Sequence, residues 1–323
     1  MNVLVVLINY KTPALTLRAL RAALADVDRL PGSRVALIDN GSGDDSVPEL
    51  AKALDGEGLR DRVDLLVSPT NRGFAGGVNL ALVPALRGPS PPRFVYLLNS
   101  DALPAPGAIE KLVRFLEADP RAGIAGSYIH GPGGETHDTA FRFPGIASQF
   151  EESLGIGVVS RLLDRYLVSK PVPRDAARVD WLAGASMLIR REVFDAIGPY
   201  DENFFFYYEE TDFCRRAAEA GFATWYVPES RVEHIGAASS GWKDQSKPRA
   251  PYWWEGRRWY FYKNHGLLYL WAVNVAWLVG FLVGEPRRRL MGRRGPFPPR
   301  YFRDFLRHNF GFRPLGRGLP THG

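Results

Sequence analysis

The feature that most constrains the fold is a regular alternation of two patterns over about the first 130 residues. Short apolar runs of the length of buried strands recur here: VLVVLIN, RVALIDN, VDLLVS, FVYLLNSD and GIAGSYI. Between them lie segments such as ALTLRALRAAL and AIEKLVRFLEA, whose apolar residues recur every three or four positions, as on one face of a helix. Strands alternating with helices are typical of α/β proteins, so the sequence predicts a mostly parallel sheet flanked by helices.

Polar residues follow several of these predicted strands at the point where each strand ends. In open α/β sheets, ligands bind beyond the carboxyl ends of the strands, where the loops meet. We therefore expect one binding site along this edge of the sheet. The polar groups in question are Asn9 with Tyr10, Asp39 with Asn40, Ser68 through Asn71, and Asn99 through Asp101.

Asp101 comes at the end of the apolar run RFVYLLNSD. A carboxylate at a strand end is well placed to bind Mg²⁺ or Mn²⁺, which commonly join one or two carboxylates to substrate phosphates. The alternative is a helix cap or turn aspartate, because the surrounding SDALPAP is also typical of turns.

The segment NRGFAGGVN, residues 71–79, follows a predicted strand and precedes a helix. Its glycines allow the close backbone approach that phosphate-binding loops need, although the spacing is not that of a dinucleotide fingerprint. The alternative is a glycine-rich turn that packs a helix against the sheet.

An acidic segment, FYYEETDFCRR, opens a predicted helix from about Tyr208 to Ala220 that Gly221 would cap. Glu209 and Asp212 share one face of this helix, whereas Glu210 points about 100° away from Glu209. The helix dipole and an i, i+4 pair with Arg216 explain Asp212 better than they explain Glu210. An aromatic wall beside a carboxylate raises its pKa, which suits a general base.

His234 follows the next predicted strand, ATWYV, and is either a structural histidine or a metal ligand. Residues 130–180 are rich in Gly and Pro and lack either periodicity, so we expect irregular structure there, forming a loop over the site. The single cysteine, Cys214, excludes an intrachain disulfide and is consistent with a reducing compartment.

Residues 266–284, GLLYLWAVNVAWLVGFLVG, contain no charged side chain and are long enough as a helix to cross a bilayer. Arginines and lysines flank the stretch on both sides, and a single span would place one basic group on the outer face. We therefore expect a hairpin-like or interfacial insertion, with arginines on anionic lipid and tryptophans at headgroup depth. The expected headgroup tryptophans are Trp253, Trp254, Trp259, Trp271 and Trp277.

The alternative for this stretch is a buried helix of a C-terminal subdomain or of a homodimer interface. The basic excess after residue 240 could also meet nucleic acid, but no nucleic-acid fold signature accompanies it, so lipid is the expected partner.

Taken together, these stretches resemble the inverting family-two glycosyltransferases with the GT-A fold. The closest resemblance is to the bacterial branch of rhamnosyltransferases and galactofuranosyltransferases that build cell-surface polysaccharide. It covers about residues 3–236 and rests on motifs in the family's order and spacing: VLINYKT, LIDNGSGDDS, NRGFAGGVN, LLNSDALP, WLAGASMLIRREVF, DENFFFYYEETDFCRR and VEH.

The resemblance implies a role for each matching residue. Asn9 and Tyr10 would lie near the nucleotide, and Asp39 would hold its base or ribose. The donor pocket would be lined by Asn71, Gly73 and Gly76. Asp101 matches the last residue of the family's Asp-x-Asp metal motif, in which Asn99 replaces the first aspartate, a change that bears on metal affinity. Glu210 matches the catalytic base, Asp212 stands next in that motif, and His234 matches a metal-proximal histidine.

The implied reaction is an inverting, metal-assisted transfer of a rhamnose-like or other hexose from a dTDP- or UDP-linked donor to a glycan or lipid-linked acceptor. We expect a catalytic domain over residues 1–240 and a membrane-association region over 241–323, on the cytoplasmic face of the plasma membrane. A sugar-nucleotide pyrophosphorylase and a catalytically silent membrane-bound scaffold are the rival interpretations. The first would need a glycine-rich loop directly after the first strand, and VLINYKTPAL contains no glycine.

Overall fold

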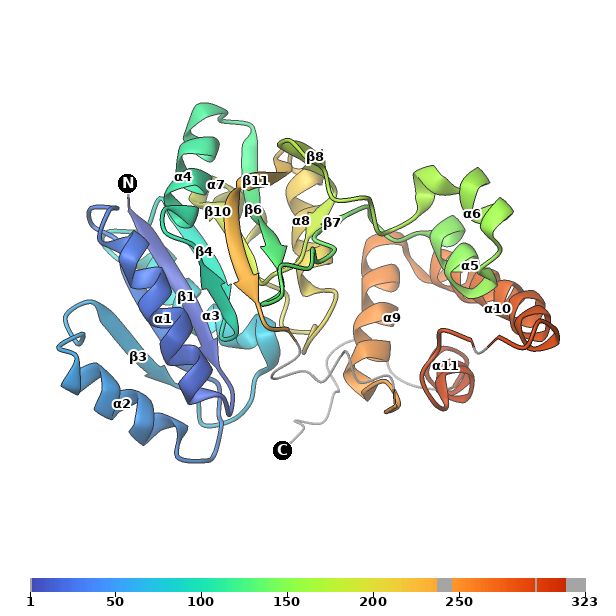
Figure 1. Ribbon diagram of the computed structural model, residues 1–323, viewed down its shortest axis with the longest axis horizontal. Coiled ribbons are helices and arrows are strands. Elements are labelled where there is room, and N and C mark those ends of the chain that lie inside the picture. The colour runs from blue at the N-terminus through green and yellow to red at the C-terminus, as the bar shows by residue number, and fades with distance from the viewer. Residues whose placement is uncertain (1, 237–245, 294, 312–323) are drawn as a thin grey trace.

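The computed structural model describes residues 2–236, 246–293 and 295–311, and its centre is a nine-stranded sheet (Figure 1). Along the sheet the strand order is β3-β2-β1-β4-β10-β6-β11-β5, with β8 paired to β11. Only β10, β5 and β8 run antiparallel to their neighbours, so the predicted mostly parallel sheet is confirmed. The strands are β1 (Val3–Asn9), β2 (Arg34–Asp39), β3 (Val63–Val67), β4 (Phe94–Asn99), β5 (Ala102–Pro104), β6 (Ala122–His130), β8 (Ala177–Val179), β10 (Ser186–Arg190) and β11 (Ala223–His234).

Helices cover both faces of this sheet. The alternation of side chains along β1 shows why: Val3, Val5 and Leu7 enter one apolar core, and Leu4 and Val6 enter the other. The first core is closed by α1 (Pro13–Val27), α2 (Ser46–Gly56) and α4 (Ala108–Ala118), and the second by α3 (Gly73–Arg87), α7 (Arg191–Ile197) and α8 (Glu209–Glu219).

The prediction of irregular structure over residues 130–180 is wrong in part. This segment contains α5 (Ile146–Leu154), α6 (Gly157–Leu162) and a 3₁₀ turn at Asp164–Tyr166, and its strand β7 (Ala140–Phe141) pairs with β9 (Trp181–Leu182). The helix α5 packs closely on α10, more than 100 residues later, where a Cβ on Gly280 would lie 2.2 Å from Ser153 Oγ. The contact that stabilises this short helix comes from a segment far away in the sequence, so it could not be predicted from the residues around it.

The C-terminal part consists of α9 (Pro251–His265), α10 (Leu267–Leu290) and α11 (Tyr301–Asn309), which lie together at one end of the sheet (Figure 1). The helix α10 is continuous through the uncharged stretch, so a hairpin within that stretch is excluded. One side of α10 packs on α5, and the other exposes large apolar side chains. We call these exposed residues the apolar stripe: Leu267, Leu268, Trp271, Val275, Val279, Leu282 and Val283.

The expected position of the tryptophans at headgroup depth is wrong for three of the five. Trp254 and Trp277 are each 1% exposed, and Trp253 is also buried, in an aromatic cluster with Tyr301 and Phe305. Trp271, in contrast, is 47% exposed on the apolar stripe.

Several of the arginines expected on lipid are internal. Arg257 donates hydrogen bonds to Gln149, Asn274 and Asn309, and Arg288 donates to the backbone carbonyls of Ser153 and Leu154 at the end of α5. These guanidinium groups therefore join the helices of the C-terminal part. The expected domain boundary between residues 240 and 241 lies outside the described residues.

Candidate functional site

The predicted site begins where β1 and β2 end side by side, in register from Leu4 with Arg34 to Asn9 with Asp39. Asn9 and Asp39 are both buried, and Asn9 Nδ2 donates to Asp39 Oδ2 at 2.8 Å. Ser42 donates to the same carboxylate through its hydroxyl and its backbone N–H. Both predicted nucleotide residues thus fix the shape of the loop, and their direct contact with a nucleotide stays a prediction.

Tyr10 lies half-buried at the end of β1, with the ammonium of Lys11 5.3 Å from its ring centroid. Lys11 has a positive φ of 58°, and its backbone N–H donates to Ser42 Oγ. The turn after β1 therefore presents an aromatic ring and a cation at the sheet edge.

Asn40 joins this turn to the glycine-containing segment. Its Nδ2 donates to Asn71 Oδ1 at 3.2 Å and to the Gly73 carbonyl at 2.9 Å, and its Oδ1 accepts from the Arg72 N–H. Asn71 Oδ1 in turn accepts the N–H of Gly73. The sequence placed Asn40 at the strand end but gave no signal that its amide links the two loops.

Gly73 is required where the loop turns into α3. Its φ is +70°, and a Cβ there would lie 2.0 Å from the carbonyl oxygen of Phe205. That same carbonyl accepts the N–H of Phe74 at 2.7 Å. At Gly76, a Cβ would lie 2.7 Å from Arg72 Cβ. The glycines thus hold the predicted donor loop against the aromatic segment that precedes α8.

Asp101 and His234 meet at the other side of the site. His234 Nε2 lies 3.0 Å from Asp101 Oδ1, and antiparallel pairing of β5 with β11 sets Ala102 opposite His234. Asp101 is 4% exposed, and Asn99 lies two residues before it, at the end of β4. The structure therefore brings the two predicted metal residues together.

A carboxylate and an imidazole form an acceptable partial donor set for Mg²⁺ or Mn²⁺. Within residues 2–236, 246–293 and 295–311, no three His, Cys, Asp or Glu side chains are grouped so that they could hold a metal ion. The chemistry fits a cation that completes its coordination with phosphate oxygens of a substrate.

Glu210 points from the first turn of α8 toward the link between β9 and β10. The N–H of Gly184 donates to Glu210 Oε1 at 3.2 Å, and a Cβ on Gly184 would lie 2.4 Å from that oxygen. The next carbonyl, that of Ala185, accepts the N–H of Asn99. The Gly184–Ala185 link therefore connects the predicted base to the end of β4, two residues before Asp101. Nothing in the sequence signalled this role, although the segment belongs to the motif WLAGASMLIRREVF.

Burial raises the pKa of Glu210 from its ordinary value to about 6, against the opposing effect of backbone N–H groups that bond to the ionised form. Burial and the neighbouring charge of Glu210 raise the pKa of Glu209 well above its ordinary value. The more exposed Glu210 is thus the carboxyl of this pair that ionises near neutral pH and can accept a proton.

Asp212 is fully buried, and both of its carboxylate oxygens are engaged. Its Oδ2 accepts from Arg216 Nε at 2.9 Å and from Lys263 Nζ at 2.8 Å, and its Oδ1 accepts from Asn264 Nδ2. Lys263 and Asn264 belong to α9. The contacts of Asp212 therefore join the helix of the predicted base to the C-terminal part.

The same helix begins under backbone strain. Tyr207 and Tyr208 have positive φ values of 76° and 71°, which are costly for bulky residues. On α9, a Cβ on Gly256 would lie 2.8 Å from the Tyr207 carbonyl, and the ring of Tyr260 lies 5.6 Å from that of Tyr208. Packing against α9 thus holds the strained entry into α8.

Comparison with known proteins gives a consistent family. A sequence model described as "Glycosyltransferase like family 2" matches residues 1–255. N-acetylglucosaminyl-diphospho-decaprenol L-rhamnosyltransferase of Mycobacterium tuberculosis is 31% identical over 245 residues, which cover 73% of this chain and 77% of that protein. Rhamnosyltransferase WbbL of Escherichia coli K12 is 24% identical over 162 residues, covering 50% of this chain and 60% of WbbL.

Two solved structures share the fold at low sequence identity. GalNAc-T7, solved with UDP, GalNAc and Mn²⁺, has a TM-score of 0.58 at 16% identity and covers 95% of this chain and 56% of its own. The mannosyltransferase PcManGT of Pyrobaculum calidifontis, solved with GDP-Man and Mn²⁺, has a TM-score of 0.56 at 15% identity, covering 91% and 76%. The chain therefore belongs to glycosyltransferase family 2 and has the GT-A fold.

Proposed function

We propose that this glycosyltransferase moves a rhamnose-like sugar from a dTDP- or UDP-linked donor to a hydroxyl of a lipid-linked glycan, with inversion at the anomeric carbon. The observation that supports the proposal is the link from Glu210 through Gly184 and Ala185 to Asn99, which connects this carboxylate to the end of β4, two residues before Asp101. The mycobacterial relative, whose name describes an L-rhamnosyltransferase acting on a diphospho-decaprenol substrate, supports the choice of sugar and acceptor.

In this proposal Glu210 is the general base. Its carboxylate takes the proton of the acceptor hydroxyl as that oxygen attacks the anomeric carbon of the donor. A pKa of about 6 leaves the group mostly ionised at neutral pH yet basic enough to accept a proton. Asp212 acts through the position of α8, because its oxygens already bond to Arg216, Lys263 and Asn264.

Asp101 and His234 would hold Mg²⁺ or Mn²⁺, which would offset the charge that develops on the departing nucleoside diphosphate. The loop from Asn71 to Gly76 would lie along the donor, with the N-terminus of α3 behind it.

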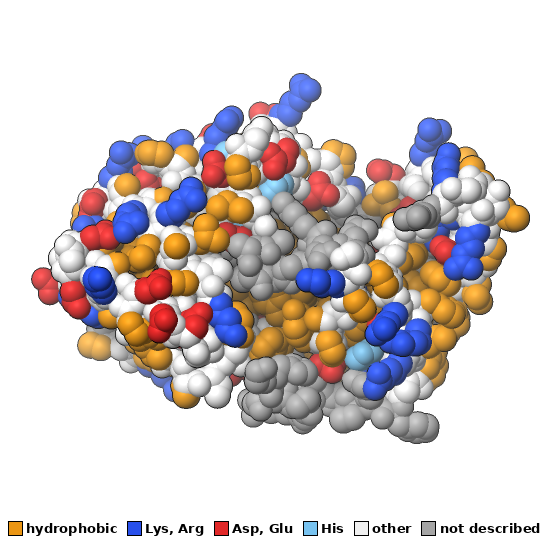
Figure 2. Space-filling view, turned by 60° about the horizontal axis from the view of Figure 1, so that its bottom comes forward, with side chains coloured by type: hydrophobic (Ala, Val, Ile, Leu, Met, Phe, Trp, Pro, Cys, Tyr) orange, Lys and Arg blue, Asp and Glu red, His pale blue; other side chains and the backbone are white. Residues whose placement is uncertain are grey.

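We also propose that the protein works at the cytoplasmic face of the plasma membrane, with α10 lying in the plane of the lipid headgroups. One side of α10 is covered by α5, and Asn274 and Arg288 on that side are buried and hydrogen-bonded within the protein. A helix with such a side is not expected to cross a bilayer with lipid on all sides. The apolar stripe on the other side, with exposed Arg287 and Arg289 at its end, matches an anionic bilayer surface. Figure 2 shows hydrophobic side chains and groups of Lys and Arg close together on the C-terminal part.

The test of the transfer reaction is turnover of purified full-length protein with a panel of dTDP- and UDP-sugars and a lipid diphosphate-linked sugar acceptor. Nucleoside diphosphate release and the anomeric configuration of the product are the measurements. We expect the rhamnosyl donor to be used with inversion. A protein that binds donors but turns over none of them with any acceptor would instead support the silent scaffold.

The membrane placement is tested by replacing Leu268, Val275 and Leu282 of the apolar stripe with Gln. We expect the triple variant to lose co-sedimentation with anionic vesicles, because the exposed apolar surface drives insertion. Replacing exposed Val158 on α6, which lies outside the stripe, with Gln is the control and should preserve binding. Unchanged sedimentation of the triple variant would contradict the placement.

A further inference from the structure

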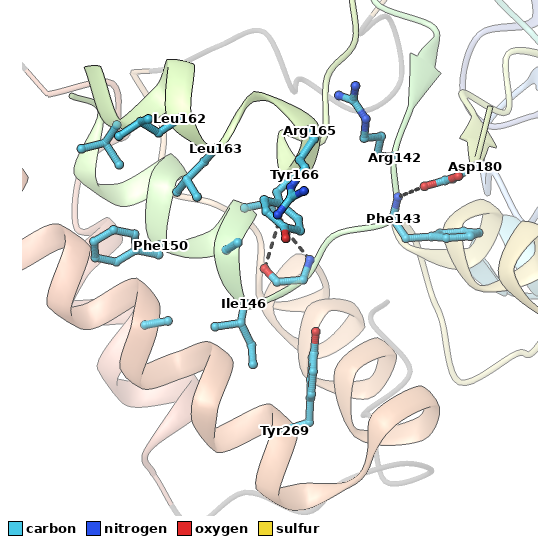
Figure 3. Close-up of a pocket in the computed structure, with 15 residues that line it drawn as sticks. Arg142, Phe143, Ile146, Phe150, Leu162, Leu163, Arg165, Tyr166, Asp180 and Tyr269 are labelled. Carbon is cyan, nitrogen blue, oxygen red and sulfur yellow. Dashed lines mark hydrogen bonds between the residues drawn. The ribbon is translucent and has the colours of Figure 1, made fainter. Parts of the chain in front are cut away.

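A cavity of about 800 Å³ lies between α5, α6 and α10, away from the catalytic edge of the sheet (Figure 3). Its volume is within the ~300–1,000 Å³ typical of small-molecule sites. Ile146 and Phe150 on α5, Leu162 on α6, and Tyr269 and Ala276 on α10 contribute to its lining. None of the residues predicted to bind donor, metal or acceptor hydroxyl lines this cavity.

The lining is apolar and partly open to solvent. Leu162 is 77% exposed, Tyr166 is 43% exposed and Ile146 is 37% exposed, although all three line the cavity. Figure 3 shows Phe150, Leu162 and Leu163 on one side of the cavity and Tyr269 on another. Apolar surface facing water in a concave site is stabilised when an apolar ligand covers it.

The cavity adjoins the apolar stripe of α10. Tyr269 directly follows the exposed Leu268, and Ala276 directly follows the exposed Val275. Both are half-buried, so both lie at the margin of the exposed helix face. The exposed apolar residues of α10 and the residues with which this helix lines the cavity are therefore neighbours on the helix surface.

Two arginines supply positive charge beside the apolar lining. The guanidinium of Arg165 lies 4.7 Å from the ring centroid of Tyr166 and has no carboxylate partner among the described residues. Arg142 donates through Nη1 to the carbonyls of Asp164 and Leu167, which fixes it at the rim. The one carboxylate of the lining, Asp180, accepts the N–H of Phe143. The net charge of the lining is therefore positive and suits a phosphate group.

The cavity is also joined to the proposed base by short structural links. Trp181 of β9 donates its indole N–H to the carbonyl of Arg142, and three residues later Gly184 bonds to Glu210. Arg142 directly follows β7, so a ligand at Arg142 would lie beside the paired strands β7 and β9. The residues that follow β9 reach Glu210.

From these features we infer that the cavity holds the first part of the polyprenyl chain of a lipid-linked acceptor, with Arg142 and Arg165 beside its phosphate. The inference rests on the proposed function for the identity of the lipid. The apolar lining, the adjoining stripe and the two cations each match one part of such a molecule.

The test measures lipid binding to purified full-length protein in nonionic detergent, without any nucleotide sugar. The probes are a long-chain polyprenyl monophosphate and, for comparison, phosphatidic acid. Ala276→Phe fills the cavity, and Ala272→Phe adds the same bulk one turn earlier on the same helix, outside the lining. Arg165→Ala removes the cation, and Arg161→Ala is its control, because Arg161 is exposed and does not line the cavity.

We expect Ala276→Phe to weaken binding of the polyprenyl probe by about tenfold, since losing the burial of two methylene groups has an effect of this size. Arg165→Ala should also weaken it by about tenfold, because a hydrogen bond to a charged group contributes a similar free energy. The two control variants should change it by less than about twofold. Equal binding by Ala276→Phe and Ala272→Phe, with Arg165→Ala also unchanged, would overturn the inference.

Tight binding of phosphatidic acid that Ala276→Phe weakens to the same degree would also overturn it, because the cavity would then hold bulk membrane lipid. Thermal melting of each variant separates loss of binding from loss of folding, and the surface change Arg165→Ala remains informative if Ala276→Phe unfolds. Transfer from dTDP- and UDP-sugars to a lipid diphosphate-linked sugar acceptor, measured separately, tests the proposed function: its absence in the wild-type protein would refute that function and leave the lipid-binding result standing.

Discussion

Replacing Glu210 with Gln should make the protein both inactive and more stable at alkaline pH. The carboxyl of Glu210 is held within the fold, where burial raises its pKa from 4.5 to about 6. The difference between these two pKa values corresponds to about 2 kcal/mol of unfolding free energy. Gln has the same size as Glu but never ionises.

The sign of the effect follows from the direction of the shift. Below pH 4.5 the carboxyl is protonated in both folded and unfolded chains, so its stabilising effect is fully present. As the pH rises through about 6, the folded protein must ionise a buried group, and this stability is lost. Relative to the wild-type protein, the Gln variant should therefore gain about 2 kcal/mol between pH 4 and pH 8.

The measurements are urea unfolding at both pH values and the pH dependence of kcat/KM for sugar transfer. We expect wild-type kcat/KM to rise with pH through an inflection near 6, and Glu210→Gln to lower kcat by roughly 10²- to 10⁴-fold while donor binding is preserved. The neighbouring change Glu209→Gln is the matched control: burial and the charge of Glu210 hold the pKa of Glu209 well above its ordinary value, so the inflection near 6 belongs to Glu210 and the variant should keep it. A stability gain that is the same at both pH values, or a rate profile without the inflection, would refute this reasoning.

Three further predictions concern the metal, the donor loop and the junction with α9. Transferase activity should disappear in excess chelator and return when Mg²⁺ or Mn²⁺ is added. The variant Asp101→Ala should lose activity while its thermal unfolding temperature changes little. Full activity in excess chelator would contradict the metal site. Gly73→Ala should abolish donor binding measured by calorimetry, because the new Cβ would lie 2.0 Å from a backbone oxygen and the donor loop would have to move. The control Gly32→Ala has a similar φ of +76° but no atom within 4 Å of the new Cβ, so it should only lower stability, by about 1 kcal/mol. Lys263→Met should destabilise the protein by about 1–3 kcal/mol in urea unfolding and lower kcat more than it raises KM, because the buried carboxylate of Asp212 on α8 then loses one hydrogen-bond donor. The control Arg114→Met removes an exposed ion pair and should change stability by less than about 1 kcal/mol. Equal effects of the two variants would argue against a stabilising contact between α8 and α9.

The sheet and the acidic helix could be predicted from the sequence because their signals are local. Apolar runs marked the central strands, and the helix expected from about Tyr208 to Ala220 is observed at Glu209–Glu219, followed by Gly221 with its positive φ. Each of these features depends on side-chain periodicity or backbone preference within a few residues.

The contacts that hold the site together could not be predicted in the same way. Asn9 and Asp39 were expected at the nucleotide, but their polar atoms bond to each other and to Ser42, a pairing set by the register of two strands far apart in sequence. Trp254 and Arg257 belong to a stretch with the composition of a membrane surface, yet both are buried, because residues of α5, α10 and α11 that are distant in the sequence pack against them. Whether a side chain is buried by a distant segment depends on the whole fold, so it cannot be predicted from the residues around that side chain.

The left-handed turn at Tyr207 and Tyr208 has a consequence for the order of events during synthesis. The sheet and its flanking helices emerge from the ribosome first and can assemble as a unit, whereas α9 follows the turn by more than 40 residues. Until α9 is present, the turn lacks its contacts with Gly256 and Tyr260, and the carboxylate of Asp212 lacks its bonds to Lys263 and Asn264. A nascent chain would therefore carry a nearly complete sheet domain in which α8, the helix of Glu210 and Asp212, is held by all its contacts only once α9 has been made.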